Sequence, residues 1–596
     1  MQKTLLQLVE EGYPLNKTGV CMAVKRDGQW VETPIEDFRK KVARFAMGLY
    51  GLGIRKGDRV GLHSENCTEW ILCDLAILSL GAVTVPIYAT QPGEQIRYIL
   101  EDSEAKVHIT SSQKLFQAFA PYVDELPNLQ LVGILGQFHD RMKTLDEVMT
   151  DGKALLNSEE AIYPAMVAAV EPEDLATLIY TSGTTGMPKG VMLTHWNIVS
   201  NVIAVKEHGF FINTEEHGGG KLLSYLPLSH IFERCMTFLA ISSGFPMYFI
   251  PNIDTFTTDI QEVKPVHFTT VPRLLEKVYT GIQTKVEAAP GAKGKLARWA
   301  FNKANSYEVG TPKTGLGWKL ADKLVLSKFR DLFGGNLVGI TSGGAALPSK
   351  IMSFMNGIGI PTAQGYGLTE TSPVLTIYNK DRLVAGSAGV VLKGVELKLI
   401  PVEGGSGDEG EIVVRGPNIM KGYYKKPKET AEVLSEDGWF YTGDIGRLDQ
   451  TGNLFITDRK KELLKLSTGK YIAPAPIENE LVLTPEIEQA IVIGNGQKFC
   501  SALLVLNVPA LLHEIKEAGH SLTEDQVWDH PEVRAHLMRV IKSCNRNLPH
   551  WEQIKDFRLL REPFSIEGGE LTPKLSMKRR VIQEKYGDVI ASMYQE

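Results

Sequence analysis

Residues 180 to 190 read Tyr-Thr-Ser-Gly-Thr-Thr-Gly-Met-Pro-Lys-Gly, and this stretch decides how the rest of the chain is interpreted. It follows an apolar run of strand length that ends at Tyr180, so it is expected to be the loop at the end of a strand. Glycines let backbone N–H groups approach an anion closely, hydroxyl groups add donors, and lysine adds a positive charge. The stretch predicts a phosphate-binding loop that uses Thr181, Ser182, Gly183, Thr184, Thr185, Gly186 and Lys189.

The spacing of this loop fits neither of the better-known nucleotide motifs. A Walker loop has Gly-Lys-Ser/Thr in direct succession, whereas here Pro188 precedes Lys189 and Gly190 follows it. A dinucleotide loop needs Gly-x-Gly-x-x-Gly at the start of a helix. A polar surface loop made of ordinary turn residues is the alternative, and the loop by itself leaves both interpretations open.

The composition sets limits on the class of protein. At 596 residues the chain is too long for one core, and roughly three to four structural units are expected. A net charge of −6 without a basic block gives no reason to expect nucleic-acid binding. The six cysteines form no Cys-x-x-Cys pair, and no signal peptide or long apolar run is present, which indicates a reducing, cytoplasmic location. The most apolar stretch, Met236 to Ile250, is divided by Ser242-Ser-Gly244 and predicts a buried helix and strand rather than a membrane anchor.

Helical and strand patterns alternate along most of the chain. Thr33-Pro-Ile-Glu36 predicts a capping box before a helix that ends near Gly51. Next come a strand (59–63), a helix (69–80) and a strand (83–87), a β-α-β unit, and the alternation continues to about residue 380. Parallel sheets with helices on both faces are expected there. After Thr376 the strands are shorter and separated by glycine turns, which predicts a small β-rich subdomain.

Seven segments in a fixed order resemble the adenylate-forming (AMP-binding) superfamily of acyl-CoA synthetases, peptide-synthetase adenylation domains and luciferases. The segments are Tyr180 to Gly190, Tyr225-Leu-Pro-Leu-Ser-His-Ile-Phe-Glu233, Ser342-Gly-Gly-Ala-Ala-Leu347, Gln364-Gly-Tyr-Gly-Leu-Thr-Glu-Thr371, Gly410 to Gly416 with Gly422-Tyr423, Gly438-Trp-Phe-Tyr-Thr-Gly-Asp444, and Asp458-Arg-Lys-Lys-Glu462. The resemblance covers nearly the whole chain.

The resemblance implies an α/β fold with two domains. The large N-terminal domain (1–458) is expected to hold two α/β sheets and a small β-rich subdomain (about 377–458). A small mobile α+β C-terminal domain (459–596) is expected to follow, with a hinge near 458–462.

The resemblance also implies the chemistry and the residues that perform it. In the family a carboxylate attacks the α-phosphate of ATP, and a thiol then displaces AMP from the acyl-adenylate. Residues 181 to 186 are implied to hold the β and γ phosphates, and Glu370 with Thr184 to bind Mg²⁺. The other implied nucleotide contacts are the backbone of Gly343, Gly344 and Ala345 against adenine, the Gln364, Gly365, Tyr366, Gly367 and Thr369 segment with Tyr366 stacking, and Asp444 and Arg459 on the ribose.

His230 matches the family histidine at the acyl pocket, where its ring is implied to orient the substrate carboxylate. Peptide-synthetase domains place an aspartate in this region, but Ile231 and Phe232 stand here, which disfavours an amino-acid substrate. The segments 226–234, 270–273 and 285–329 look most like those of long-chain fatty acyl-CoA synthetases. A buried acyl tail contributes about 0.8 kcal/mol per CH₂.

Three further roles are implied near the C-terminus. Lys461 matches the hinge, and Gly469 matches the loop that lines the thiol path for CoA. The lysine that acts in adenylation is ambiguous, because alignment on Arg579-Arg580 puts Ser576 at its position. Alignment on the preceding proline favours Lys578, with Lys574 as the alternative.

The leading hypothesis is therefore an ATP-dependent long-chain fatty acid:CoA ligase with fatty acid, ATP, Mg²⁺ and CoA as ligands. The alternatives are a fatty acyl-AMP ligase that loads a carrier-protein thiol, and a catalytically silent lipid- or nucleotide-binding relative. A cytoplasmic protein is expected, and peripheral contact with the membrane is compatible with a substrate that resides in bilayers. The sequence does not set the preferred chain length or the oligomeric state.

Overall fold

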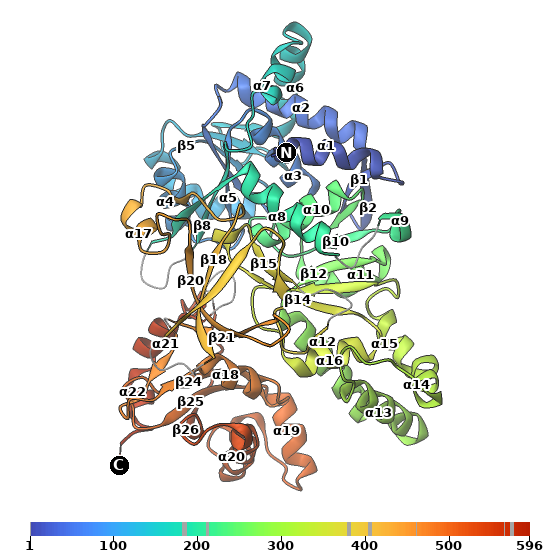
Figure 1. Cartoon of the computed structure of the whole chain (residues 1–596), viewed down its shortest axis with the longest axis vertical. Coiled ribbons are helices and arrows are strands. Elements are labelled where there is room, and N and C mark those ends of the chain that lie inside the picture. The colour runs from blue at the N-terminus through green and yellow to red at the C-terminus, as the bar shows by residue number, and fades with distance from the viewer. Residues whose placement is uncertain are drawn as a thin grey trace. The chain divides into compact units, whose positions relative to one another are not determined.

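The computed structural model describes residues 2–181, 187–209, 214–377, 383–402, 408–460, 462–565, 567–571 and 577–595 (Figure 1). The chain divides into two compact units, which are described one at a time. The first consists of Met1–Glu396 and Val414–Phe440, and the second of Leu397–Val413 and Tyr441–Glu596. The predicted β-rich segment (about 377–458) is therefore shared between the two units, with residues 397–413 and 441–458 in the second, and the predicted domain boundary and hinge remain predictions.

The first sheet of the first unit has the strand order β19-β9-β8-β4-β3-β5-β6-β7. Its strands are β3 (Arg59–His63), β4 (Val83–Ile87), β5 (Ala105–Thr110), β6 (Gln130–Gly133), β7 (Met142–Thr144), β8 (Leu175–Thr181), β9 (Lys189–Thr194) and β19 (Gly422–Tyr423). Pairing is parallel from β8 through β7, whereas β9 runs antiparallel to both β8 and β19. The predicted β-α-β unit is confirmed by β3, α3 (Thr68–Ser79) and β4.

Helices accompany this sheet along the chain. They are α2 (Ile35–Gly51), α4 (Gly93–Asp102), α5 (Gln113–Phe119), α6 (Leu145–Ser158), α7 (Ile162–Ala168) and α8 (His195–His208). The predicted capping box before α2 does not form, because Thr33 belongs to the preceding strand and Pro34 is the N-cap without a side-chain hydrogen bond. Glu36 and Asp37 lie in the first turn instead, where their charges favour the positive end of the helix dipole.

The second sheet has the order β16-β15-β14-β13-β12-β10-β11-β1-β2. Its strands are β1 (Val20–Arg26), β2 (Gln29–Pro34), β10 (Leu222–Ser224), β11 (Met247–Phe249), β12 (His267–Thr270), β13 (Gly339–Ser342), β14 (Thr362–Gly367), β15 (Val374–Ile377) and β16 (Val390–Val391). The central strands from β1 through β14 are parallel, and the strands at both edges are antiparallel. The parallel centre fits the alternation of helix and strand patterns in the sequence.

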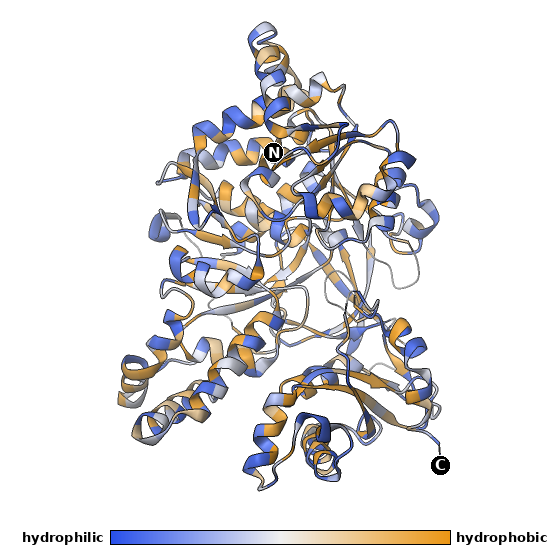
Figure 2. Cartoon of the chain, turned by 180° about the vertical axis from the view of Figure 1, so that it is seen from behind, coloured by the Kyte–Doolittle hydropathy of each residue, from blue (hydrophilic) through white to orange (hydrophobic). Residues whose placement is uncertain are grey.

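The remaining helices of the first unit belong mainly to this sheet. They are α1 (Leu5–Gly12), α9 (Thr214–His217), α10 (Ile231–Ser242), α11 (Phe256–Val263), α12 (Pro272–Ala288), α13 (Gly291–Asn305), α14 (Leu316–Ala321), the π-helical turn η4 (Asp322–Leu326), α15 (Ser327–Asp331), α16 (Ser349–Gly357) and α17 (Pro427–Ala431). The apolar stretch from Met236 to Ile250 forms the end of α10 and β11, and the prediction of a buried helix and strand is confirmed. Figure 2 shows hydrophobic residues concentrated on the strands.

The second unit contains three smaller sheets. Their strands are β17 (Glu396–Pro401), β18 (Glu409–Arg415), β20 (Phe440–Leu448) and β21 (Leu454–Arg459); β22 (Leu464–Lys465) and β23 (Tyr471–Ile472); and β24 (Ile487–Ile493), β25 (Cys500–Leu506) and β26 (Ile554–Leu560). The helices are α18 (Pro474–Val482), α19 (Val508–Glu517), α20 (Pro531–Cys544), α21 (Arg579–Lys585) and α22 (Gly587–Ala591). Two α/β sheets followed by a small α+β part confirm the predicted fold class.

All six cysteines are free thiols, and all except the half-buried Cys544 are buried. No disulfide framework is therefore present, as the scattered spacing predicts. Within the described ranges, no helix is both long and apolar enough to cross a membrane.

Candidate functional site

Three of the predicted site residues of the first unit follow the carboxyl ends of parallel strands in the second sheet. His230 comes after β10, Gly343 directly after β13, and Glu370 shortly after β14. Because β10, β12, β13 and β14 are parallel neighbours, their carboxyl ends meet at one edge. Ligands of open α/β sheets bind outside this edge.

Backbone and side-chain hydrogen bonds fix the Gly343 loop at this edge. The Gly343 amide donates to the Thr270 carbonyl (3.0 Å), and the Leu347 amide donates to Oε1 of Gln364 (2.7 Å). A Cβ at Gly343 would lie 3.0 Å from the Phe232 ring, and Gly344 has a φ of +79°, so both positions favour glycine. Gly344 and Ala345 are exposed, so their backbone is accessible to a ligand.

His230 is the N-cap of α10, and its ring is held in place by the helix it begins. Nδ1 accepts the Phe232 amide hydrogen at 3.1 Å. A neutral imidazole in this arrangement carries its proton on Nε2, the nitrogen that can donate to a carboxylate. The side chain is half-buried, so the site retains the histidine in a defined orientation.

The residues that follow His230 on α10 form a buried charged group that the sequence did not single out. Glu233 is 1 % exposed, and Oε2 accepts a hydrogen bond from the Thr269 hydroxyl. Burial raises the pKa of Glu233 to about 7, although the hydroxyls of Ser224 and Thr269 oppose the shift. Arg234 pairs with Asp74 in α3 through two hydrogen bonds, Nε to Oδ2 at 2.8 Å and Nη2 to Oδ1 at 2.5 Å.

A chain of contacts joins Glu370, through Tyr423 of β19, to the start of β9, the strand that follows the predicted phosphate loop. The Tyr423 hydroxyl donates to Oε1 of Glu370 (3.0 Å), and Nζ of Lys189 lies 5.1 Å from the centre of the Tyr423 ring. The Met420 amide also donates to the Glu370 carbonyl (2.9 Å). Burial, together with the Glu370 charge, raises the pKa of the Tyr423 hydroxyl, which therefore remains a donor at neutral pH. A cation, a phenol and a carboxylate are thus brought together.

The predicted phosphate loop joins the antiparallel strands β8 and β9. Thr181, at the end of β8, pairs in register with Lys189, at the start of β9. The predicted residues Ser182, Gly183, Thr184, Thr185 and Gly186 lie outside the described residues, so the structure places only the two ends of the loop.

The donor set fits the predicted magnesium ion. Glu370 offers a half-buried carboxylate whose orientation is held by Tyr423. Magnesium in nucleotide sites takes one or two carboxylates and otherwise phosphate and water oxygens. Among the described residues, no group of three His, Cys, Asp or Glu side chains could hold a metal.

The segment between β14 and β15 is tightly packed. A Cβ at Gly367 would lie 1.7 Å from the Pro373 carbonyl oxygen, so only glycine fits. Thr369 is buried, whereas Gly365 and Tyr366 are half-buried at the end of β14. The Asn418 side chain donates to the Thr371 carbonyl (2.8 Å) and helps to hold the turn that carries Glu370.

In the second unit, the two predicted ribose contacts face each other across paired strands. Asp444 on β20 lies opposite Arg459 on β21, with 3.4 Å between Oδ1 and Nε. The Lys460 amide donates to the Gly443 carbonyl (2.8 Å) and closes this end of the pair. Burial raises the pKa of the neighbouring Asp458 to about 7, with Glu462 and Glu478 adding to the shift.

The remaining predicted residues of the second unit occupy turns. Gly469 lies between β22 and β23 with a φ of +82° and open space where a side chain would point. Lys578 is the half-buried N-cap of α21, and its amide donates to the Glu570 carbonyl (2.7 Å). Lys461, Lys574 and Ser576 lie outside the described residues.

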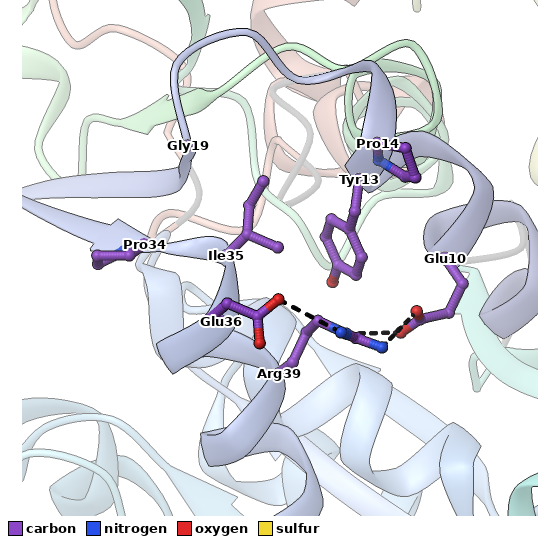
Figure 3. Close-up of a pocket in the computed structure, with 8 residues that line it drawn as sticks. All are labelled: Glu10, Tyr13, Pro14, Gly19, Pro34, Ile35, Glu36 and Arg39. Carbon is purple, nitrogen blue, oxygen red and sulfur yellow. Dashed lines mark hydrogen bonds and ion pairs between the residues drawn. The ribbon is translucent and has the colours of Figure 1, made fainter.

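A cavity of about 510 Å³ lies elsewhere in the first unit (Figure 3). It is lined by Glu10, Tyr13, Pro14, Gly19, Pro34, Ile35, Glu36 and Arg39. Arg39 bonds to Glu10 (2.8 Å) and approaches Glu36 (3.5 Å), so its charge is already compensated. None of the predicted site residues lines this cavity.

Sequence reasoning missed Tyr423, Glu233 and the pair formed by Asp74 and Arg234 as residues of the site region. Tyr423 and Glu233 lie inside segments that matched the family, but the match assigned no role to either residue. Asp74 gave no signal, because its partner is 160 residues away in the chain.

Comparisons with known proteins show the family of the chain. A family model described as AMP-binding enzyme matches residues 13–424, and one described as AMP-binding enzyme C-terminal domain matches residues 461–596. The chain is 35% identical to the long-chain-fatty-acid–CoA ligase FadD15 of Mycobacterium bovis, over 95% of this chain and 93% of the relative. It is 31% identical to the rat long-chain-fatty-acid–CoA ligase 5, over 100% of this chain and 89% of the relative.

Solved structures share the fold. The A domain of a carboxylic acid reductase from Segniliparus rugosus, in complex with AMP and a co-purified carboxylic acid, has a TM-score of 0.77 at 21% identity and covers 99% of this chain and 94% of that one. The adenylation domain of a carboxylate reductase from Mycobacterium chelonae has a TM-score of 0.76 at 24% identity, and the match covers 100% of this chain and 91% of that one.

Proposed function

This chain belongs to the AMP-binding enzyme family, and we propose on that basis that it is an ATP-dependent ligase that joins a long-chain fatty acid to CoA. The substrate class is supported by the two fatty-acid–CoA ligase relatives, each of which matches nearly the whole chain. The fatty carboxylate attacks the α-phosphorus of ATP, and pyrophosphate leaves. The thiolate of CoA then attacks the acyl carbon, AMP leaves, and the thiol proton passes to solvent.

The observation that carries the proposal is the contact chain of Lys189, Tyr423 and Glu370. Both partners in the first step are anions, so the site must supply positive charge and fixed donors. Lys189 provides a cation at the end of the phosphate loop, and Tyr423 fixes the carboxylate opposite. We assign the triphosphate to this place, with Thr181 and the loop after it as further donors.

A bound magnesium ion would neutralise charge on the phosphates. We propose Glu370 as its protein ligand, together with Thr184. The protein's own part is to hold the Glu370 carboxylate in place through the Tyr423 hydroxyl and the Met420 amide.

We propose that His230 orients the fatty carboxylate through Nε2. Its Nδ1 is engaged by the Phe232 amide, which selects the tautomer that this role needs. The glycine surface at Gly343 and Gly344 is assigned to adenine, with Ala345 beside it and the Gln364 to Thr369 segment, including Tyr366, completing the nucleotide contacts. Gln364 supports this surface through its bond to the Leu347 amide.

In the second unit we propose ribose contacts for Asp444 and Arg459, the adenylation role for Lys578, and the thiol path for Gly469. Lys461 is assigned to a hinge near 458–462 between domains 1–458 and 459–596. Each of these roles rests on the family resemblance. The pairing of Asp444 with Arg459 supports the first of them, because it sets a carboxylate and a guanidinium side by side.

We place the protein in a reducing cytoplasmic compartment, because all six cysteines are free.

The decisive experiment combines the protein with palmitate, ATP, Mg²⁺ and CoA. AMP, pyrophosphate and acyl-CoA should appear together and in equal amounts. Accumulation of acyl-AMP in the presence of CoA would instead select a fatty acyl-AMP ligase that loads a carrier-protein thiol. Binding of ATP and palmitate without release of pyrophosphate would select a silent binding protein.

The adenylation lysine is tested by Lys578→Ala beside Lys574→Ala. Lys578→Ala should lower pyrophosphate release by about a hundredfold or more, as expected for the loss of a charge that acts only in the transition state. Attack of CoA on supplied acyl-adenylate should be spared. If the defect appears with Lys574→Ala and not with Lys578→Ala, the assignment moves to Lys574.

A further inference from the structure

Three leucines form an exposed apolar stripe on α14 and the π-helical turn that follows it. Leu316 is 86% exposed, Leu320 51% and Leu324 39%. Their spacing of four residues places them on one helical face. Ala321 and Val325, which follow Leu320 and Leu324, are buried, so the same helical segment packs on the core through a neighbouring face and leaves the leucines exposed.

An exposed tryptophan extends this stripe. Trp299 on α13 is 40% exposed, and a Cβ at Gly317 would lie 3.9 Å from its ring. Leu316 is the neighbour of Gly317, so the ring of Trp299 and the first leucine belong to one surface. Helices α13, α14 and α15 lie together at the lower right of Figure 1, and at the lower left of Figure 2 hydrophobic and hydrophilic residues alternate along them. We call α13 to α15 the helical arm.

Positive charge surrounds the apolar stripe. Residues 291–331 contain nine Lys and Arg and three Asp and Glu, a formal net charge of +6, whereas the whole chain carries −6. Lys319 and Lys323 directly precede Leu320 and Leu324 in the chain and are exposed, so they flank the leucine stripe. The charge of the helical arm is therefore opposite in sign to that of the protein as a whole.

We propose that the helical arm docks on the surface of an anionic lipid bilayer, with Leu316, Leu320, Leu324 and Trp299 inserted at the interface and the lysines on the headgroups. Leucine and tryptophan on one side with flanking lysines is the pattern of helices that lie in a membrane interface. The choice of a bilayer rests on the proposed function, because a long-chain fatty acid partitions into membranes. Docking would bring the protein to the phase that holds its substrate.

Flotation with vesicles tests the proposal. The full-length protein should float with vesicles of phosphatidylcholine and phosphatidylglycerol, less with phosphatidylcholine alone, and less as salt is added. Leu316→Glu/Leu320→Glu should abolish flotation. Lys319→Glu/Lys323→Glu should lower the partition coefficient on anionic vesicles by about 25-fold or more, because each lysine near such a surface contributes about fivefold.

Matched controls use exposed residues outside the arm. Leu135→Glu changes a leucine that is 55% exposed, and Lys114→Glu/Lys153→Glu reverses two exposed lysines. Both controls should float like the unchanged protein. If the control variants lose as much flotation as the arm variants, the assignment to this surface is overturned. Flotation that neither arm variant changes would overturn it as well. Thermal unfolding of every variant checks that the fold is kept.

Two further results separate the competing explanations. Sedimentation should show the same oligomeric state for the unchanged protein and for Leu316→Glu/Leu320→Glu; a dimer that this variant dissolves would mean that the stripe binds a second copy. Ligase activity is measured without vesicles, with fatty acid supplied on albumin. Normal activity without flotation overturns the docking alone, and flotation without any pyrophosphate release overturns the function alone.

Discussion

Breaking the buried ion pair of Arg234 and Asp74 should weaken the first unit strongly. Both side chains are 0% exposed, and the Thr84 hydroxyl also donates to Asp74 (2.7 Å). Asp74 lies on α3 beside the first sheet and Arg234 on α10 beside the second, so the pair links the two sheets. Arg234 is also only four residues from His230, the N-cap of α10.

The magnitude follows from the desolvation of the remaining charge. Arg234→Met leaves the Asp74 carboxylate buried without its cation, at a cost of about 3–5 kcal/mol. Asp74→Asn should cost a similar amount, because the guanidinium then stays buried without its anion. The double variant leaves no uncompensated charge, so its loss should be smaller than the sum by roughly 1–3 kcal/mol.

Urea unfolding followed by intrinsic fluorescence measures these free energies. The guanidinium carbon of Arg234 lies 5.7 Å from the ring centre of the fully buried Trp70, so one fluorophore reports on the pair itself. The surface charge variant Lys114→Glu serves as the control and should stay within about 0.5 kcal/mol of the unchanged protein. Strictly additive losses, or a loss below about 1 kcal/mol for Arg234→Met, would refute the desolvation argument.

Three further outcomes are expected. Burial raises the pKa of Glu233 from its usual 4.5 to about 7, so the folded state binds this proton more tightly than the unfolded state. The free energy of unfolding should therefore fall by about 3 kcal/mol as the pH rises from 4.5 to 7. Glu233→Gln should remove this pH dependence, and identical pH profiles of unfolding for the variant and the unchanged protein would contradict the argument. Tyr423→Phe removes the hydrogen bond that orients the Glu370 carboxylate. It should raise the Mg²⁺ concentration needed for half-maximal pyrophosphate release by about tenfold, with little change in thermal stability. An unchanged Mg²⁺ dependence would argue against Glu370 as the metal ligand. Gly367→Ala forces a Cβ to within 1.7 Å of the Pro373 carbonyl and should destabilise by roughly 1–3 kcal/mol or more, whereas Gly587→Ala, with nothing within 4 Å, is the control.

The fold was predictable where local pattern and long-range packing agree. The strands 59–63 and 83–87 appear with the predicted bounds, because each is a short apolar run bordered by turn residues. The prediction of a capping box at Thr33 is wrong, because threonine also suits a strand. The pairing of β1 with β2 places Thr33 in the strand instead of at the start of the helix. Strand order in the sheets depends on pairing between distant segments, which no local pattern encodes.

The candidate site was predictable only as a set of separate segments. The segments that carry Lys189 and Glu370 were both recognised, but no local pattern indicates that Tyr423 connects them. The role of Gly343 followed from the resemblance, whereas its closeness to Phe232 is a packing property that needs the folded chain. The pKa of Glu233 likewise depends on burial, and a glutamate in a sequence looks the same whether it is buried or solvated.

The burial of the cysteines makes their reaction with alkylating reagents a measure of local opening. Burial raises the pKa of every thiol, to about 12 for Cys21, Cys67, Cys235 and Cys500, to about 11 for Cys544, and well above the usual range for Cys73. The thiolate is the form that reacts with an alkylating reagent, so each of the five buried cysteines reacts only after its surroundings open. Because Cys235 lies in the first unit and Cys500 in the second, the order in which they become alkylated ranks the two units by how often each one opens.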